Sequence, residues 1–146
     1  MVFELDRQRY ALQLAAVDRI VRAVEVTPLP GAPDIVLGAI NVEGRVLPVL
    51  DIRRRFRLPE REIRIEDQIV IAQMTARSVA LVIDEACDVI EREPSASVDA
   101  NLSVSRIEPV EGVIELDDGL VLIHDLDKFL SPDETRTLDR AMHGAD

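Results

Sequence analysis

Residues 38–51 read Gly-Ala-Ile-Asn-Val-Glu-Gly-Arg-Val-Leu-Pro-Val-Leu-Asp, and they carry the clearest structural signal in the chain. Two apolar runs flank Glu43-Gly44, where glycine can adopt the positive φ of a tight turn. The pattern predicts a β-hairpin formed by 39–42 and 46–50. Asp51 follows directly, and its carboxylate can accept the free N–H groups of a helical turn that begins near Ile52.

The same arrangement returns in the second half of the chain. Residues 112–126 contain a strand opened by glycine, an acidic turn ending in Gly119, and a second strand closed by Asp125. Two further segment pairs match outside the hairpins: 9–14 with 78–83, and 17–28 with 83–94. This internal repeat predicts two small β-barrels related by a pseudo-twofold axis and packed along an apolar seam.

The composition indicates a β protein with an aliphatic core. The chain has 146 residues, of which 47% are hydrophobic and only 3% aromatic, and its valine and isoleucine content favours strands. A net charge of −11 repels phosphate backbones and anionic membrane surfaces, which argues against nucleic acid and direct membrane contact. One cysteine excludes an internal disulfide, and the apolar runs are too short to span a membrane. A cytoplasmic location fits best.

Hydrophobic patterning predicts the other strands. They are expected at 2–5, 10–14, 21–26, 69–74, 79–83 and 87–92. Val17, Ile20 and Val21 recur at helical spacing, which predicts a helical turn over 15–20. The serine-rich segment 95–105 is expected to be flexible.

The chain is expected to end in a helix. Residues 131–134, Ser-Pro-Asp-Glu, combine a capping box with proline at the first helical position. The helix should run to about Met142 and stop at Gly144. Leu138 and Met142, four residues apart, would anchor it on the core.

Six arginines lie within 53–64, close to acidic residues. The charges of Glu60, Glu62, Glu66 and Asp67 offset them. The pattern therefore favours a solvated loop whose side chains pair with one another, because exposed ion pairs contribute little. A basic binding site is the alternative interpretation.

The chain lacks the motifs of several kinds of chemistry. Its isolated glycines form neither a P-loop nor a dinucleotide fingerprint, so no cofactor is predicted. Residues 124–127, His-Asp-Leu-Asp, are better explained by Asp125 capping a helical turn than by a metal site. Cys87 lies in a predicted strand without a histidine nearby in the sequence, so a buried, inert thiol is expected. No catalytic residues are predicted, and the chain is not expected to be an enzyme.

In their order and spacing these motifs resemble CheW, the family of chemotaxis coupling proteins, over essentially the whole chain. The matching elements are Val17-x-x-Ile20, the proline-rich turn, the 38–51 hairpin, 83–85 (Ile-Asp-Glu) and the closing strand 119–126. The resemblance implies two interlocked, pseudo-symmetric SH3-like five-stranded β-barrels, covering about 1–67 and 68–130. Short helical turns and a C-terminal helix at 131–143 complete the expected fold.

The resemblance also implies a function. CheW-like proteins are non-enzymatic adaptors that link chemoreceptors to the regulatory domain of the histidine kinase CheA. The chain would then be cytoplasmic and recruited to membrane-bound receptor arrays. Assembly into kinase–adaptor rings is an option that the resemblance leaves open.

Two binding surfaces follow from the resemblance. The receptor groove lies between the barrels, and its matching positions are Leu14, Val17, Ile20, Val24, Ile40 and Val42. Alternation alone cannot distinguish a groove from a core, so ordinary core is the alternative for each position. Kinase docking uses barrel-end surfaces in both halves, and the matching positions are Ile35, Val36, Gly38, Asn41, Glu43, Gly44, Asp117, Asp118 and Gly119.

The chain departs from the family pattern at two charged positions. Where the family usually has Asn-Leu-Arg-Gly, this chain has Glu43 in place of the arginine, and where Val-x-Glu-Ile is usual it has Arg19 in place of the glutamate. We expect Arg19 and Glu43 to face each other as an ion pair of inverted polarity. Opposed like charges at an interface are costly, so the inversion predicts a dedicated set of partners.

Other functions remain open at this stage. The chain could be an orphan or antagonistic CheW-like protein that competes for kinase or receptor, and Glu43 motivates that alternative. It could also be a small β-barrel regulatory domain that binds a ligand in an apolar seam. A rise in melting temperature with a bound small molecule would favour the ligand-binding alternative.

Overall fold

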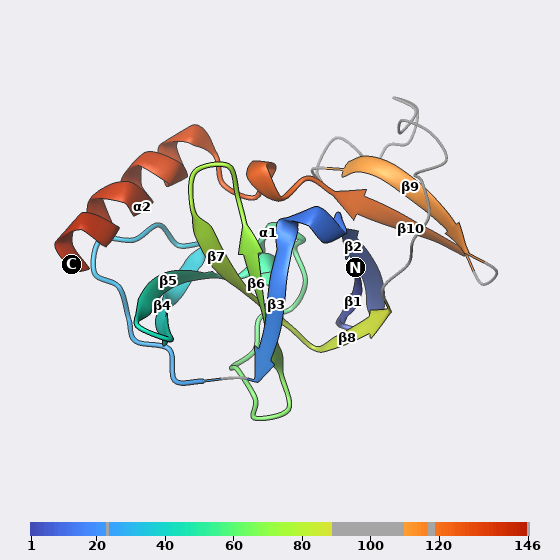
Figure 1. Cartoon of the computed structure of the whole chain (residues 1–146), viewed down its shortest axis with the longest axis horizontal. Coiled ribbons are helices and arrows are strands. Elements are labelled where there is room, and N and C mark those ends of the chain that lie inside the picture. The colour runs from blue at the N-terminus through green and yellow to red at the C-terminus, as the bar shows by residue number, and fades with distance from the viewer. Residues whose placement is uncertain (23, 89–109, 117–118, 146) are drawn as a thin grey trace.

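The structure, a computed structural model, describes residues 1–22, 24–88, 110–116 and 119–145, and it is mainly β (Figure 1). The expected flexible segment 95–105 and most of the expected strand 87–92 lie outside these ranges. Two five-stranded sheets have the orders β8-β1-β2-β10-β9 and β3-β6-β7-β5-β4. The strands are β1 (Val2–Leu5), β2 (Gln8–Leu12), β3 (Val17–Arg22), β4 (Val36–Val42), β5 (Arg45–Leu50), β6 (Gln68–Gln73), β7 (Ser78–Ile83), β8 (Glu85–Asp88), β9 (Val110–Leu116) and β10 (Gly119–His124).

The two sheets exchange strands. β3 follows β2 in the chain but pairs with β6 in the second sheet. β8 follows β7 and likewise pairs with β1 in the first sheet. Each sheet thus combines a hairpin from one half of the chain with three strands from the other, so the ranges 1–67 and 68–130 are interwoven.

The parallel strand pairs make the pseudo-twofold relation visible residue by residue. β5 runs parallel to β7, with Leu50 opposite Leu81. β10 runs parallel to β2, with His124 opposite Leu12. His124 therefore occupies in the second half the position that Leu50 occupies in the first.

The central strands are buried on both faces. Val70 and Leu81 belong to the largest apolar cluster, which joins residues of both sheets. Their chain neighbours Ile69 and Ala80 belong to a separate cluster within the second sheet. The first sheet has its own smaller cluster of Val2, Ala11, Val121 and Ile123. This two-sided burial explains the continuous apolar runs of the sequence, and the predicted apolar seam is present.

The predicted hairpin and both predicted caps are confirmed. Glu43 (φ 52°) and Gly44 (φ 84°) form the turn between β4 and β5 with the positive φ angles of a tight hairpin. Asp51 accepts a hydrogen bond from the Arg54 N–H at 3.3 Å and caps α1 (Ile52–Arg55). Asp125 accepts from the Asp127 N–H at 3.1 Å and caps the short 3₁₀ turn η3 (Leu126–Lys128).

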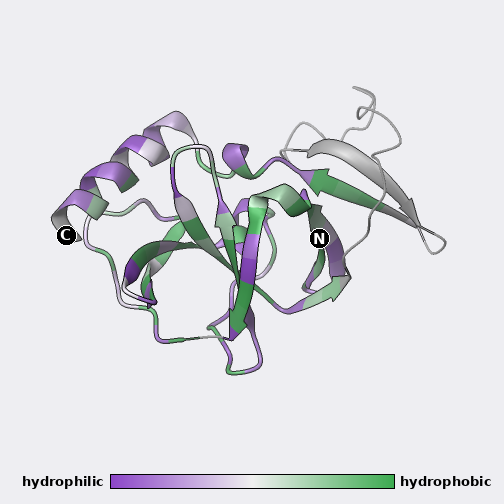
Figure 2. Cartoon of the chain, viewed as in Figure 1, coloured by the Kyte–Doolittle hydropathy of each residue, from purple (hydrophilic) through white to green (hydrophobic). Residues whose placement is uncertain are grey.

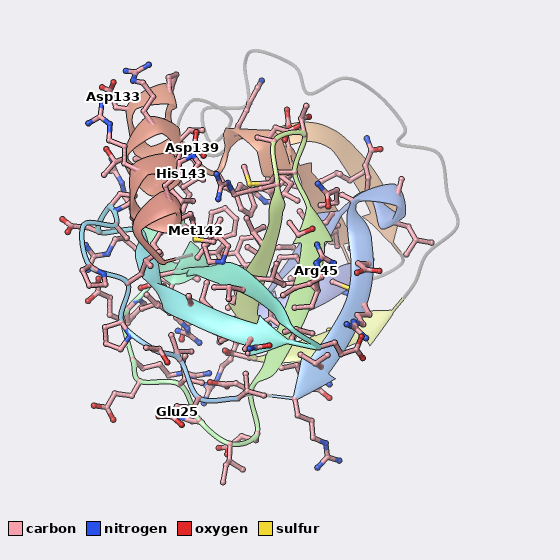
Figure 3. The ribbon with its side chains drawn as sticks, turned by 60° about the vertical axis from the view of Figure 1, so that its left-hand side comes forward. Glu25, Arg45, Asp133, Asp139, Met142 and His143 are labelled. Atoms are coloured by element: carbon pink, nitrogen blue, oxygen red, sulfur yellow. The ribbon has the colours of Figure 1, made fainter. Side chains whose placement is uncertain are left out.

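The C-terminal helix α2 (Pro132–Ala145) covers part of the core. Its capping box is formed: Glu134 N–H donates to Ser131 Oγ at 3.1 Å, and Ser131 N–H donates to Glu134 Oε1 at 2.8 Å. Leu138 is fully buried, and Met142 points from α2 toward the sheets whereas Asp133 points away (Figure 3). Most residues of α2 are hydrophilic, in contrast to the strands (Figure 2).

Several predicted boundaries are wrong. The expected helical turn over 15–20 is a 3₁₀ turn, η1 (Leu14–Ala16), followed at once by β3. The expected strand 21–26 therefore starts earlier, at Val17, and β2 ends at Leu12 rather than at Leu14. α2 continues through Gly144 to Ala145. In the described ranges, no helix has both the length and the apolarity needed to cross a membrane.

Candidate functional site

An apolar groove of about 260 Å³ lies where the edge strands β3 and β8 approach each other. These two strands occupy equivalent positions in the two sheets. The groove is lined by Met1, Leu14, Val17, Arg19, Ile20, Ala86 and Cys87. Exposed apolar side chains in a groove between two rigid sheets are suited to binding an apolar segment of another protein.

The structure divides the six predicted groove residues into two groups. Leu14, Ile20 and Val24 are exposed, by 48%, 38% and 44%, and Leu14 and Ile20 line the groove with the half-buried Val17. Ile40, only 2% exposed, belongs to the core of the second sheet, and the partly buried Val42 packs against that core. For Ile40 the alternative interpretation as core is therefore the right one.

Sequence reasoning missed one wall of the groove. Met1, Ala86 and Cys87 line it opposite β3. Cys87 is exposed, so the expectation of a buried thiol is wrong. The reason is that β8 is the outermost strand of its sheet, and one of its faces opens into the groove instead of packing on a core. No sequence signal marks an edge strand of this length.

The β4–β5 turn forms a second surface feature. Glu43 and Gly44 are exposed at its tip, and the side-chain oxygen of Asn41 accepts a hydrogen bond from the Gly44 N–H at 2.9 Å. The second predicted turn includes Asp117 and Asp118, which lie outside the described residues, and only Gly119 is described there, exposed and with φ 138°.

Three other predicted docking residues lie at the opposite end of β4 from this turn. Ile35 and Val36 are 3% and 9% exposed and belong to the core, whereas Leu37 between Val36 and Gly38 is 41% exposed. Gly38 has φ 157°, and a side chain there would meet the Thr27 carbonyl oxygen at 2.3 Å. Buried or backbone-covered residues cannot contact a partner directly. In this segment, Leu37 is therefore the residue whose side chain is available for contact.

An ion pair links the groove to the turn. Arg19 Nη1 donates to Glu43 Oε1 at 2.9 Å, as expected from the charge inversion. Their hydrogen bond and opposite charges lower the pKa of Glu43 and raise that of Arg19. Both side chains are exposed, by 39% and 73%, so the pair contributes little to stability. Its position, with Arg19 in the groove wall and Glu43 at the turn, gives it a place in both surfaces.

The arginine-rich loop contains a half-buried ionic network. Arg53 Nη2 and Arg61 Nη2 both donate to Asp84 Oδ1 at 2.6 Å, and Arg61 also holds Asp67 with two bonds of 2.7 Å. The Asp6 N–H donates to the other Asp84 oxygen at 2.8 Å. Burial acts to raise the pKa of Asp84, but the hydrogen bonds from Arg53 and Asp6 and the two arginine charges outweigh it and lower that pKa.

The loop was expected to pair its charges and to be solvated. Pairing within the loop is confirmed for Arg54 with Glu60 and for Arg61 with Asp67. Arg53 and Arg55 instead pair with carboxylates outside the loop, Asp84 and Glu134. Solvation is wrong for Arg53 and Asp67, which are 8% and 2% exposed. Within the described part of the chain, no group of three or more His, Cys, Asp or Glu side chains is arranged to hold a metal ion.

Comparison with known proteins places this geometry in a family context. Residues 1–134 match the family model of the CheW-like domain. The chain is 31% identical to "Chemotaxis protein CheW" of Bacillus subtilis over 139 residues, which cover 94% of this chain and 89% of the relative. It is 28% identical to the protein of the same name from Rhizobium meliloti, with 92% and 88% coverage.

A solved structure is similar as well. It is the scaffolding protein TtCheW from Thermoanaerobacter tengcongensis, with a TM-score of 0.75, 27% identity and coverage of 91% of this chain and 92% of that one. The similarity thus covers nearly the whole length of both chains.

Proposed function

This chain belongs to the CheW-like domain family, and we propose that it is a non-enzymatic chemotaxis scaffold that couples chemoreceptors to a CheA-type histidine kinase. The observation that carries the proposal is the exposed apolar groove between β3 and β8, where Leu14, Val17 and Ile20 face solvent or line the hollow. The grouping of these side chains in one hollow, rather than their exposure alone, is what supports a binding surface. The groove is suited to an apolar helix face, such as the cytoplasmic tip of a receptor.

The kinase is proposed to dock at the β4–β5 turn. Asn41, Glu43 and Gly44 form its tip, and the exposed Leu37 lies further along β4. A scaffold needs two surfaces that can be occupied together, and the groove and the turn meet that requirement because they share only the Arg19–Glu43 contact. The proposed location is the cytoplasm, at receptor arrays.

Calorimetric titration with the regulatory domain of a CheA-type kinase from the same organism tests the docking turn. Binding in about the micromolar range is expected, and Glu43→Arg should weaken it at least about tenfold because it reverses a charge at the interface. Glu66→Arg is the matched control, since it makes the same charge change at an exposed loop residue. Equal affinities for the two variants would contradict docking at the turn.

Labelling of Cys87 tests the groove. It is the only cysteine of the chain, and it is exposed in the groove wall. A bulky maleimide on its thiol should abolish binding of a receptor cytoplasmic fragment and leave kinase binding intact. Cys87→Ser treated with the same reagent is the control. Undiminished receptor binding by the labelled chain would place the receptor elsewhere.

The inverted Arg19–Glu43 pair gives a prediction about partner choice. The double variant Arg19→Glu, Glu43→Arg keeps the ion pair but restores the polarity usual in the family. We expect it to lose affinity for the chain's own partners and to gain affinity for the kinase and receptor of a typical family member. Competition binding against both partner sets measures the shift, and an unchanged preference would show that polarity has no role in selection.

A further inference from the structure

A second hollow, of about 240 Å³, lies beside α1 and away from the groove. Three arginines converge on it, and its lining consists of Asp34, Ile35, Arg54, Arg55, Arg57 and Glu134. Ile35 is buried and closes the hollow with an apolar surface. In a chain of net charge −11, such a concentration of guanidinium groups is a local exception.

The three arginines are neutralised to different degrees. Arg55 is held by Glu134 at 2.6 Å. Arg54 has one close partner, Glu60 at 2.7 Å, and one loose partner, Asp34, at 3.9 Å with a side chain that is 95% exposed. Arg57 is exposed, and among the described residues no carboxylate lies within 4 Å of its guanidinium. Within the described part of the chain, the hollow therefore offers one guanidinium without an ion-pair partner, that of Arg57, and a second, that of Arg54, with one distant and exposed partner.

The backbone at Arg57 is strained. Its φ is 58°, in the left-handed region, just after the end of α1. Glycine or asparagine is the usual residue at such a helix end, because a larger side chain is disfavoured there. Asp6, Arg7 and Glu43 share a positive φ, so the backbone of Arg57 by itself indicates no function. It means that glycine at this position would relieve strain while removing the guanidinium from the hollow.

We propose that this arginine hollow binds a carboxylate side chain of an acidic segment on a partner protein. Arg57 would supply the free guanidinium, and the incoming carboxylate would replace Asp34 on Arg54. A planar carboxylate suits the two-pronged geometry of arginine. A phosphate dianion is disfavoured, because Asp34 and Glu134 also line the hollow and would repel the second charge. This contact goes beyond the proposed function, since it belongs to neither the groove nor the β4–β5 turn.

The experiment uses the full chain and a defined probe, an acetylated and amidated hexaglutamate peptide, at physiological ionic strength. Arginine Nε–Hε signals are followed by NMR during the titration. We expect saturable shifts at Arg54 and Arg57, and an affinity at least about fivefold lower for Arg57→Gly. The same substitution should raise the urea midpoint of unfolding, because it relieves the strained backbone.

Arg7→Gly is the matched control. Arg7 is also exposed, has φ 66° and does not line the hollow. It should gain stability in the same way and keep its affinity for the peptide. The proposal is overturned if both variants bind equally well, if no signal shifts, or if inorganic phosphate saturates the hollow at lower concentration than the peptide does. None of these outcomes depends on the kinase or the receptor, so the proposed function is tested separately.

Discussion

Replacing Asp84 by alanine is expected to lower the free energy of unfolding by about 3 kcal/mol. Asp84 accepts hydrogen bonds from Arg53, Arg61 and the Asp6 N–H. These groups come from the first hairpin, from α1 and from the loop before β6, all in the first half of the chain. Asp84 belongs to the second half, so its carboxylate links the two halves. Its loss leaves the Arg53 guanidinium, 8% exposed, without its closest acceptor, and a buried charge without its partner is costly.

Urea unfolding followed by far-UV circular dichroism measures this effect. Glu43→Ala is the matched control, because it removes a carboxylate from an arginine at 2.9 Å where both side chains are exposed. The control should cost less than about 1 kcal/mol. Similar losses of unfolding free energy for both variants would show that the Asp84 network stabilises the fold no more than an exposed ion pair does.

The chain is expected to lose up to about 3 kcal/mol of stability as the pH falls from 6.5 to 4, because of His124. Its ring is 1% exposed and packs against Tyr10, Phe56 and Phe129, with ring centroids 5.4, 4.7 and 6.5 Å away. Burial lowers its pKa from 6.5 to about 4. The unfolded chain therefore takes up a proton near pH 6.5 that the folded chain resists until about pH 4, so this stability is fully present only above pH 6.5.

His124→Leu should remove this pH dependence, because leucine is the residue at the equivalent position 50 of the first half. His143→Gln is the control, since His143 is exposed on α2. Urea midpoints at pH 7 and pH 5 measure both. If His124→Leu still lost as much stability as the unchanged chain between these pH values, another group would be responsible.

The sequence predicted local features well because their causes are local. The β4–β5 turn follows from Glu43-Gly44, the helix caps follow from Asp51 and Asp125, and the capping box follows from the spacing of Ser131 and Glu134. In each case the residues that interact are at most a few positions apart. The internal repeat also predicted that the two halves have similar topology, because hairpins that recur in the same order favour two sheets of the same kind.

The failures concern exposure and distance. In β3 the half-buried positions alternate as Val17, Arg19 and Val21. The exposed Ile20 adds an apolar residue three positions after Val17, and this spacing resembles that of a helix. An apolar residue kept at the surface is what a binding groove requires, so the local pattern fails at the candidate site itself. Ile40 shows the converse, since nothing in its alternation distinguishes a core position from a groove position.

The Asp84 network could not be predicted for a different reason. Asp84 lies 31 residues from Arg53 and 23 from Arg61, and its repeat equivalent, Asp18, is exposed. Only the strand exchange, which carries β8 across to the first sheet, brings these groups together. Partner choice at long range is set by topology and cannot be inferred from spacing.

In the proposed scaffold, one copy of this chain holds a kinase and a receptor at the same time. The most direct measurement is size-exclusion chromatography of the CheA regulatory domain and a receptor cytoplasmic fragment, with and without the chain. We predict that the kinase domain and the receptor fragment elute together only when the chain is present, and that the maleimide label on Cys87 releases the receptor alone. Binding of either partner that excluded the other, or binding of neither by the folded chain, would contradict the scaffold function.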